Sequence, residues 1–199
     1  MRNRNEKLSR MVLGAMFAAI VVVMTVIPYM GYITHFGISI TTLHIPVILC
    51  AVMLGWKYGA LIGGVWGVSC LVKAFVEPIP ANVPFQNPTI SVVPRILVGL
   101  AAAGLFWLFT EKIRLKPWIA AVIAAVGGTL TNTVLVLSEL AAFGHLGDTT
   151  VADTFKLIIE TLVAVNGVIE MVAAIIIVPV LYLAVQKYSK SRHTSVNVK

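Results

Sequence analysis

The sequence predicts an all-α integral membrane protein with six transmembrane helices and with both its N- and C-termini in the cytoplasm. Three observations support this fold class. Of the 199 residues, 59% are hydrophobic and only 12% are charged, whereas a soluble domain is about one quarter charged. The mean hydropathy is +0.95, and the apolar residues fall in runs that are long enough to cross a bilayer core of about 30 Å. The basic residues gather at both ends of the chain and in two short loops.

The distribution of charge orients the predicted helices and restricts the partners of the chain. Twelve of the fifteen Lys and Arg residues lie in the two tails, at Lys57 or in the loop of residues 111–116. Short basic loops and tails are typical of the cytoplasmic side of a membrane protein. The net charge of +7 therefore indicates a lipid bilayer as the partner, and we expect no nucleic acid to bind.

The predicted spans cover about residues 8–30, 43–54, 56–76, 91–110, 118–142 and 165–185, so that residues 1–199 form a single membrane domain. We interpret the first apolar run as a span because no small-residue cleavage site follows it. The second span rises only about 16 Å, which is too short for the bilayer core. Either it starts deep beneath a loop that dips into the protein, or residues before His44 extend it. In the uncharged loop 31–42 apolar and polar residues alternate. This alternation predicts an extended segment that covers the protein on its outer side.

Small residues at a spacing of four mark two of these helices as close-packing surfaces. The first span carries two such pairs, Gly14 with Ala18 and Ala15 with Ala19. Small residues let another helix approach closely in lipid, and this surface serves either internal packing or the docking of a partner protein. The third span begins with a glycine repeat that predicts a tight packing seam; its members are Gly55, Gly59, Gly63 and Gly67.

A proline-rich loop, residues 77–90, leads into the fourth span, and Arg95 lies in the first turn that we predict for that helix. Placing an arginine at the bilayer centre costs at least about 2.5–3.5 kcal/mol, so the side chain needs a partner or water. One interpretation is an ion pair with Glu139 or Glu170. The other is an anion-binding site, because helix N-termini favour anions and a guanidinium matches a carboxylate.

Polar side chains on three predicted helices converge at one height. At 1.5 Å per residue, Arg95 lies about 22 Å above Thr110, Asn132 about 21 Å above Trp118, and Glu170 about 25 Å above Lys187. These heights predict a polar cavity that opens outward. The predicted substrate-binding residues are Phe85, Gln86, Asn87, Arg95, Trp66, Asn132, Asn166 and Glu170. Alternatives stay open: helix-to-helix hydrogen bonds for Asn132 and Asn166, a turn cap for Gln86 and Asn87, and packing for Trp66.

The motifs of common enzymes are missing from the sequence. It contains no HExxH or GxSxG motif and no phosphate-binding loop, and we expect no enzyme, although an intramembrane site at Ser91 or Ser138 is a distant alternative. Scattered histidines and the apolar positions of Cys50 and Cys70 predict neither a metal site nor a disulfide. A stand-alone secondary transporter or channel for an organic anion, with Glu139 or Glu170 as its ion site, is the main alternative to a binding subunit.

Taken together, four features resemble the substrate-binding S components of energy-coupling factor (ECF) vitamin transporters. They are the six-span plan, the Ala15/Ala19 pair, the Asn-Pro loop that runs into Pro94-Arg95, and the Thr-Asn-Thr sequence of the fifth span. The resemblance covers essentially the whole chain. Residues 85–99 and 166–170 are most similar to the family members that carry pantothenate.

This resemblance implies the capture of a small carboxylated vitamin near the outer face, gated by the loops after the first and third spans. It implies that Gly14, Ala15, Ala18 and Ala19 dock onto a membrane coupling protein. Two cytoplasmic ATPases would then use the ATP, and this chain would need no cofactor. For pantothenate, Arg95 would hold the carboxylate, with amide side chains for the hydroxyl and amide groups. Folate and niacin are also carboxylates and remain alternatives, and Glu170 would compete for Arg95.

Overall fold

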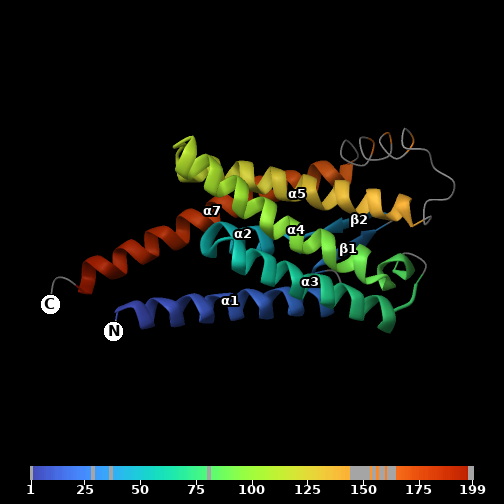
Figure 1. Ribbon diagram of the computed structural model, residues 1–199, viewed down its shortest axis with the longest axis horizontal. Coiled ribbons are helices and arrows are strands. Elements are labelled where there is room, and N and C mark those ends of the chain that lie inside the picture. The colour runs from blue at the N-terminus through green and yellow to red at the C-terminus, as the bar shows by residue number, and fades with distance from the viewer. Residues whose placement is uncertain are drawn as a thin grey trace.

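The computed structural model is a bundle of long helices with a short hairpin set into it (Figure 1). It describes residues 2–27, 30–35, 38–79, 82–143, 153, 156, 160 and 165–196. Five of the described helices are long and apolar enough to cross a membrane, and α2 is a shorter apolar helix. The elements are α1 (Arg2–Val26), β1 (Tyr32–His35), β2 (Ile38–Thr41), α2 (His44–Leu54), α3 (Trp56–Val76), α4 (Pro88–Trp107), α5 (Pro117–Ala142) and α7 (Val165–Val196). The class of helical membrane protein is thus confirmed.

The short helix α2 is enclosed by the other helices and begins beneath a β-hairpin. Its first nine residues, 44–52, are all buried. Strands β1 and β2 pair antiparallel, from Tyr32 opposite Thr41 to His35 opposite Ile38. The Thr42 N–H then donates to the Gly31 carbonyl at 3.1 Å and closes the base of the hairpin. Of the two possibilities left open above, the structure therefore has the short helix below a dipping loop, and that loop is a paired hairpin.

Helix α4 begins three residues earlier than predicted, and this moves Arg95 away from the helix start. Asn87 is the N-cap, where its Oδ1 accepts the Thr89 N–H at 3.0 Å, and Pro88 occupies the first turn. Proline suits this position because its missing N–H would have no helical partner there. Arg95 follows Pro88 by seven residues, about two turns. The expectation that the helix N-terminus itself acts on an anion beside Arg95 was therefore wrong.

The ends of two other helices also differ from the prediction. The polar and basic residues 186–199 predict a loose tail after the last span, but helix α7 continues to Val196, so residues 186–196 are helical. Helix α1 starts at Arg2 and ends at Val26, whereas the predicted span ran over residues 8–30. Charged residues among apolar ones predict a short amphipathic helix over residues 151–164, and this segment lies outside the described residues apart from residues 153, 156 and 160.

A glycine seam joins α3 to α4. A Cβ atom added to Gly63 would lie 2.1 Å from the Arg95 carbonyl oxygen, and one added to Gly59 would lie 2.7 Å from the Gly99 carbonyl oxygen. Such contacts are possible only without side chains, so the predicted seam is confirmed. Gly55 is different, because it forms the turn between α2 and α3 with a φ of +88°, a conformation that favours glycine.

The small residues of α1 are divided between two faces. Gly14 is buried, and a Cβ atom added there would lie 2.8 Å from the Tyr58 ring of α3. Ala18, on the same face, is half-buried, whereas Ala15 and Ala19 are exposed. Internal packing thus uses the Gly14 face, and only the Ala15/Ala19 face is open to a further protein.

Candidate functional site

Arg95 is the centre of the candidate site and lies between two aromatic rings. Its side chain is 4% exposed, and its Cζ lies 5.1 Å from the centroid of the Trp66 ring and 5.2 Å from that of Phe85. A guanidinium is attracted to aromatic faces and stacks on them. Three of the predicted site residues, from α3, from the turn before α4 and from α4 itself, are therefore brought together.

The neighbouring proline explains how the guanidinium is oriented. Pro94 has no N–H, so the carbonyl four residues earlier, that of Ile90, loses its helical donor. Arg95 Nη1 donates to this carbonyl oxygen at 2.6 Å. The side chain turns back toward the N-terminal end of α4, as helical side chains do. The Pro94-Arg95 pair therefore both creates an acceptor and fixes the guanidinium against it.

Neither candidate counter-ion pairs with Arg95. Glu170 Oε1 instead accepts the Thr41 N–H of the hairpin at 2.5 Å. Glu139 Oε2 is buried without a hydrogen-bond partner in the part of the chain that the structure describes, and so is Arg95 Nε. A buried polar atom left without a partner costs about 1–3 kcal/mol. The ion-pair interpretation is thus not what this structure shows, and Arg95 retains a donor for an anion.

The packing of α4 against α5 sets the heights of the polar side chains. These helices run antiparallel, and a Cβ atom added to Gly128 would lie 3.6 Å from the Ala102 Cβ. Counting outward from this contact at about 1.5 Å per residue places Arg95 opposite residue 135. Asn132 is then about 4.5 Å nearer the inner end, and Glu139 about 6 Å nearer the outer end. We call Arg95, Asn132 and Glu139 the polar band; Asn132 Oδ1 is also buried without a partner among the described residues.

Helix α7 brings Glu170 to the same height. The Phe106 ring of α4 meets the Tyr182 ring of α7 with their centroids 5.4 Å apart. Eleven residues outward on each helix lie Arg95 and residue 171, so Glu170 is level with Arg95 to within about 1.5 Å. The heights counted from the sequence thus agree with the packing. Asn166 belongs to α7, but its side chain lies outside the described residues.

The turn before α4 uses its polar side chains to hold Phe85 in place. Gln86 Nε2 donates to the Ala74 carbonyl at 3.0 Å, and the Ser91 hydroxyl donates to the Phe85 carbonyl. Together with the Asn87 cap, these bonds fix the turn Val83–Gln86 over Arg95. Gln86 and Asn87 therefore have the structural role that the sequence left open, and their contact with a substrate stays a prediction.

Tyr32 connects the hairpin to this site, and the sequence did not single it out. The Trp66 indole N–H donates to the Tyr32 hydroxyl oxygen at 3.3 Å. Lys73 Nζ lies 5.2 Å from the centroid of the Tyr32 ring. His44, one of the scattered histidines, is fully buried, and neither of its ring nitrogens has a hydrogen-bond partner among the described residues.

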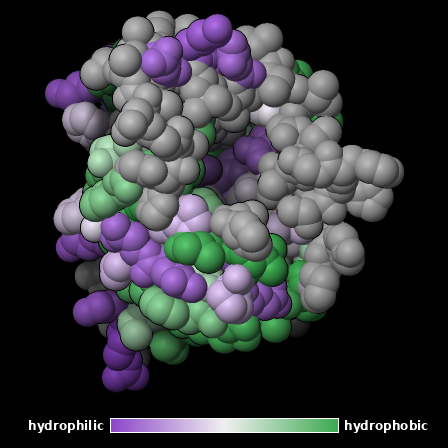
Figure 2. Space-filling model, turned by 90° about the vertical axis from the view of Figure 1, so that its right-hand side faces the viewer, coloured by the Kyte–Doolittle hydropathy of each residue, from purple (hydrophilic) through white to green (hydrophobic). Residues whose placement is uncertain are grey.

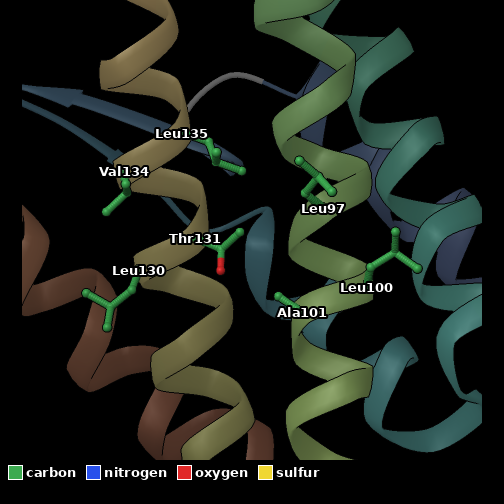
Figure 3. Close-up of a pocket in the computed structure, with 7 residues that line it drawn as sticks. All are labelled: Leu97, Leu100, Ala101, Leu130, Thr131, Val134 and Leu135. Carbon is green, nitrogen blue, oxygen red and sulfur yellow. The ribbon is translucent and has the colours of Figure 1, made fainter.

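The outer end and the flank of the bundle offer two different openings. Figure 2 shows the end opposite the two termini, which is hollowed near its centre with hydrophilic residues inside. A groove of about 640 Å³ lies between α4 and α5, and apart from Thr131 its lining is apolar (Figure 3). The Thr131 hydroxyl is already bonded to the Gly127 carbonyl at 2.7 Å. The groove therefore has no group for a charged ligand, whereas the hollow agrees with the predicted polar cavity. The lining residues of the groove are Leu97, Leu100, Ala101, Leu130, Thr131, Val134 and Leu135.

Comparison with known proteins decides the family. Residues 9–182 match the family model described as the ECF transporter, substrate-specific component. The chain belongs to this family. It is thus an S component, the substrate-specific part of a transporter, and a multi-pass protein of the cell membrane. Members of this family are transporter components rather than enzymes, which agrees with the expectation from the sequence.

The names of two similar proteins state the substrate that each transports. This S component is 30% identical over 199 residues to the pantothenic acid transporter PanT of Lactococcus lactis subsp. cremoris, covering 92% of this chain and 97% of that protein. It is 33% identical over 144 residues to the pantothenate transporter PanT of Leuconostoc mesenteroides subsp. mesenteroides, covering 65% of this chain and 71% of that protein. The resemblance noted from the sequence is thereby confirmed at the level of the family.

Proposed function

We propose that this S component captures pantothenate at the outer face of the membrane and is the specificity subunit of an ATP-driven importer. The observation that carries the proposal is the buried guanidinium of Arg95. It is stacked between two aromatic rings and has no carboxylate partner among the described residues. A bidentate carboxylate is the anion that best matches a guanidinium. The names of the two similar proteins support pantothenate as the molecule that supplies it.

The remaining groups of the polar band suit the rest of the molecule. Pantothenate carries one carboxylate, one amide and two hydroxyl groups. With the carboxylate on Arg95, Asn132 is a candidate for a polar contact on the inner side of that carboxylate, because its Oδ1 is buried without a partner among the described residues. Asn166, which precedes Glu170 by one turn on α7, is a further candidate for a polar contact.

Several features support six membrane passes with cytoplasmic termini. Both termini lie at one end of the bundle (Figure 1). Exposed tryptophans begin α3, end α4 and lie in the first turn of α5, and Lys57 and Lys112 lie 5.4 and 5.7 Å from the rings of Trp56 and Trp107. Tryptophan at the interface and lysine or arginine in short loops are typical of the cytoplasmic boundary. In this arrangement α2 and the hairpin above it together make the second pass.

The energy for uptake would come from partner proteins. We assign the docking of a membrane coupling protein to Ala15 and Ala19, because both are exposed on α1 and small enough for close helix approach. Gly14 and Ala18 face the bundle, so we do not assign them to this docking surface. Two cytoplasmic ATPases bound to the coupling protein would use ATP, so this chain itself requires no cofactor.

A calorimetric titration of the purified protein tests the substrate assignment, with folate and niacin as competitors. We expect saturable, one-to-one binding of pantothenate below micromolar concentration and no displacement by equimolar folate or niacin. Failure to bind pantothenate at micromolar concentration, or tighter binding of either competitor, would refute the assignment. Pantothenate uptake into liposomes that lack the ATPases but carry a proton gradient would instead indicate a secondary transporter.

A further inference from the structure

Glu139 has a position and an unmet bonding capacity that the functions assigned so far do not use. We infer that Glu139 is the specificity-determining residue for the hydroxyl end of the substrate. Its carboxylate accepts hydrogen bonds from substrate hydroxyl groups while Arg95 holds the substrate carboxylate. The site thereby selects hydroxylated monocarboxylates. This inference rests on the proposed function and deepens it.

The first step is the bonding state of Glu139. An ionised carboxylate only accepts hydrogen bonds, so what Glu139 lacks is a donor. Its Oε2 is buried, and no described residue donates to it. Glu170, the other acidic side chain at this height, already accepts the hairpin N–H of Thr41. Glu139 therefore has a buried carboxylate oxygen whose acceptor capacity is unused among the described residues and can serve a ligand.

The second step is geometry. Asn132 and Glu139 are seven residues apart on α5, so they share one face of the helix. Arg95 lies between them in height, with Glu139 about 6 Å nearer the outer end. A ligand whose carboxylate is anchored on Arg95 and whose chain extends outward reaches Glu139 with its far end. That end must supply hydrogen-bond donors, and in pantothenate the two hydroxyl groups at the end opposite the carboxylate supply them.

The third step is electrostatic selection. A second carboxylate on the ligand would meet the Glu139 carboxylate at close range, and like charges at about 4 Å repel by several kcal/mol near a protein surface. Dicarboxylates such as folate are thus disfavoured. A carboxylate without hydroxyl groups, such as niacin, leaves Glu139 without a donor. All three vitamins carry a carboxylate that Arg95 can bind. We therefore infer that Glu139 is the residue that makes their affinities differ.

The test compares two ligands on two proteins. The ligands are pantothenate and an analogue in which both hydroxyl groups are replaced by hydrogen, and the proteins are the wild type and Glu139→Gln. We expect the wild type to bind pantothenate at least about tenfold more tightly than the analogue. In Glu139→Gln this ratio should fall to about two- or threefold, with the affinity for the analogue unchanged. Glu111→Gln, an exposed acid at the inner end, is the matched control and should keep the wild-type ratio.

The outcomes separate this inference from competing roles. If Glu139 only competes with the ligand for Arg95, its replacement will tighten both ligands equally, and the inference is refuted. Equal weakening of both ligands would show a structural role and refute the inference as well.

If Glu139→Gln does not fold, measurements on the wild type alone still test the inference. An analogue with a carboxylate in place of the terminal hydroxymethyl group should bind at least tenfold more weakly than pantothenate, and equal binding would overturn the inference. A wild type that does not bind pantothenate refutes the proposed function, whereas one that binds it without preference over the dehydroxylated analogue refutes only the role of Glu139.

Discussion

At the scale of the residue, Arg95 is stabilised without a carboxylate. Two aromatic faces and the Ile90 carbonyl surround the guanidinium, and its Nε is left without a partner among the described residues. Neutral groups hold the cation in place, and neither Glu139 nor Glu170 forms an ion pair with it. A substrate carboxylate therefore supplies what the site itself does not.

We predict that Pro94 lowers the stability of α4 and at the same time fixes the position of the Arg95 guanidinium. Replacing it in Pro94→Ala restores an N–H for the Ile90 carbonyl, which proline withholds at a cost of about 3 kcal/mol in a helix interior. We expect a higher melting temperature in detergent and several-fold weaker pantothenate binding, because the backbone N–H competes for the carbonyl that anchors the guanidinium. Pro88→Ala, at the helix start, is the control and should leave binding unchanged. Tighter binding by Pro94→Ala would contradict this role.

At the scale of the element, the α3–α4 seam and the hairpin hold the site together. The glycines of α3 let α4 approach so closely that the Trp66 ring reaches the guanidinium of Arg95. The hairpin contacts the same site through Tyr32, and it is tied to α7 through Glu170. The site thus depends on contacts between helices that are far apart in sequence.

A methyl group in the seam should separate these helices. In Gly63→Ala the new Cβ would lie 2.1 Å from the Arg95 carbonyl oxygen, and overpacking of this kind costs about 1–3 kcal/mol. We expect a lower melting temperature together with weaker pantothenate binding. Gly104→Ala, with no atom within 4 Å of its new Cβ, should be at least as stable as the wild type because alanine favours helices. Equal stability of the two variants would refute the seam.

The Glu170 carboxylate is expected to hold the hairpin closed over the site. Glu170→Ala removes the acceptor of the Thr41 N–H, so the hairpin should open more often and release ligand faster. Hydrogen–deuterium exchange of residues 38–42 measures the opening directly, and Glu111→Ala serves as the control. Unchanged protection of this segment in Glu170→Ala would show that the hairpin is held by other contacts.

At the scale of the whole molecule, the sequence predicted the class, the common height of Arg95 and Glu170, and the glycine seam. These follow from hydropathy, helix rise and residue size, which are properties of single segments. The start of α4 was misplaced because Pro88 was assigned to the proline-rich loop 77–90, whereas it occupies the first turn of the helix. The partners of Glu170 and Trp66 were not predictable, since both depend on where the hairpin packs.

Assembly with a coupling protein is predicted to depend on the exposed alanines of α1. The double variant Ala15→Leu with Ala19→Leu places large side chains on the only open small-residue face of this helix. We expect loss of the complex in co-purification with the coupling protein, while pantothenate binding is retained. Val12→Leu with Val23→Leu, at exposed and already bulky positions of α1, is the control. Loss of binding as well as assembly would mean that this face belongs to the fold.

The most direct test of the central claim is the affinity of Arg95→Ala for pantothenate, measured by calorimetry beside the wild type. Charge-assisted hydrogen bonds contribute about 1.5–3 kcal/mol each, so the variant should bind at least about tenfold more weakly. Lys112→Ala, an exposed cation at the opposite end of the molecule, should bind like the wild type. Wild-type affinity in a folded Arg95→Ala variant would contradict the role of Arg95 as the carboxylate anchor.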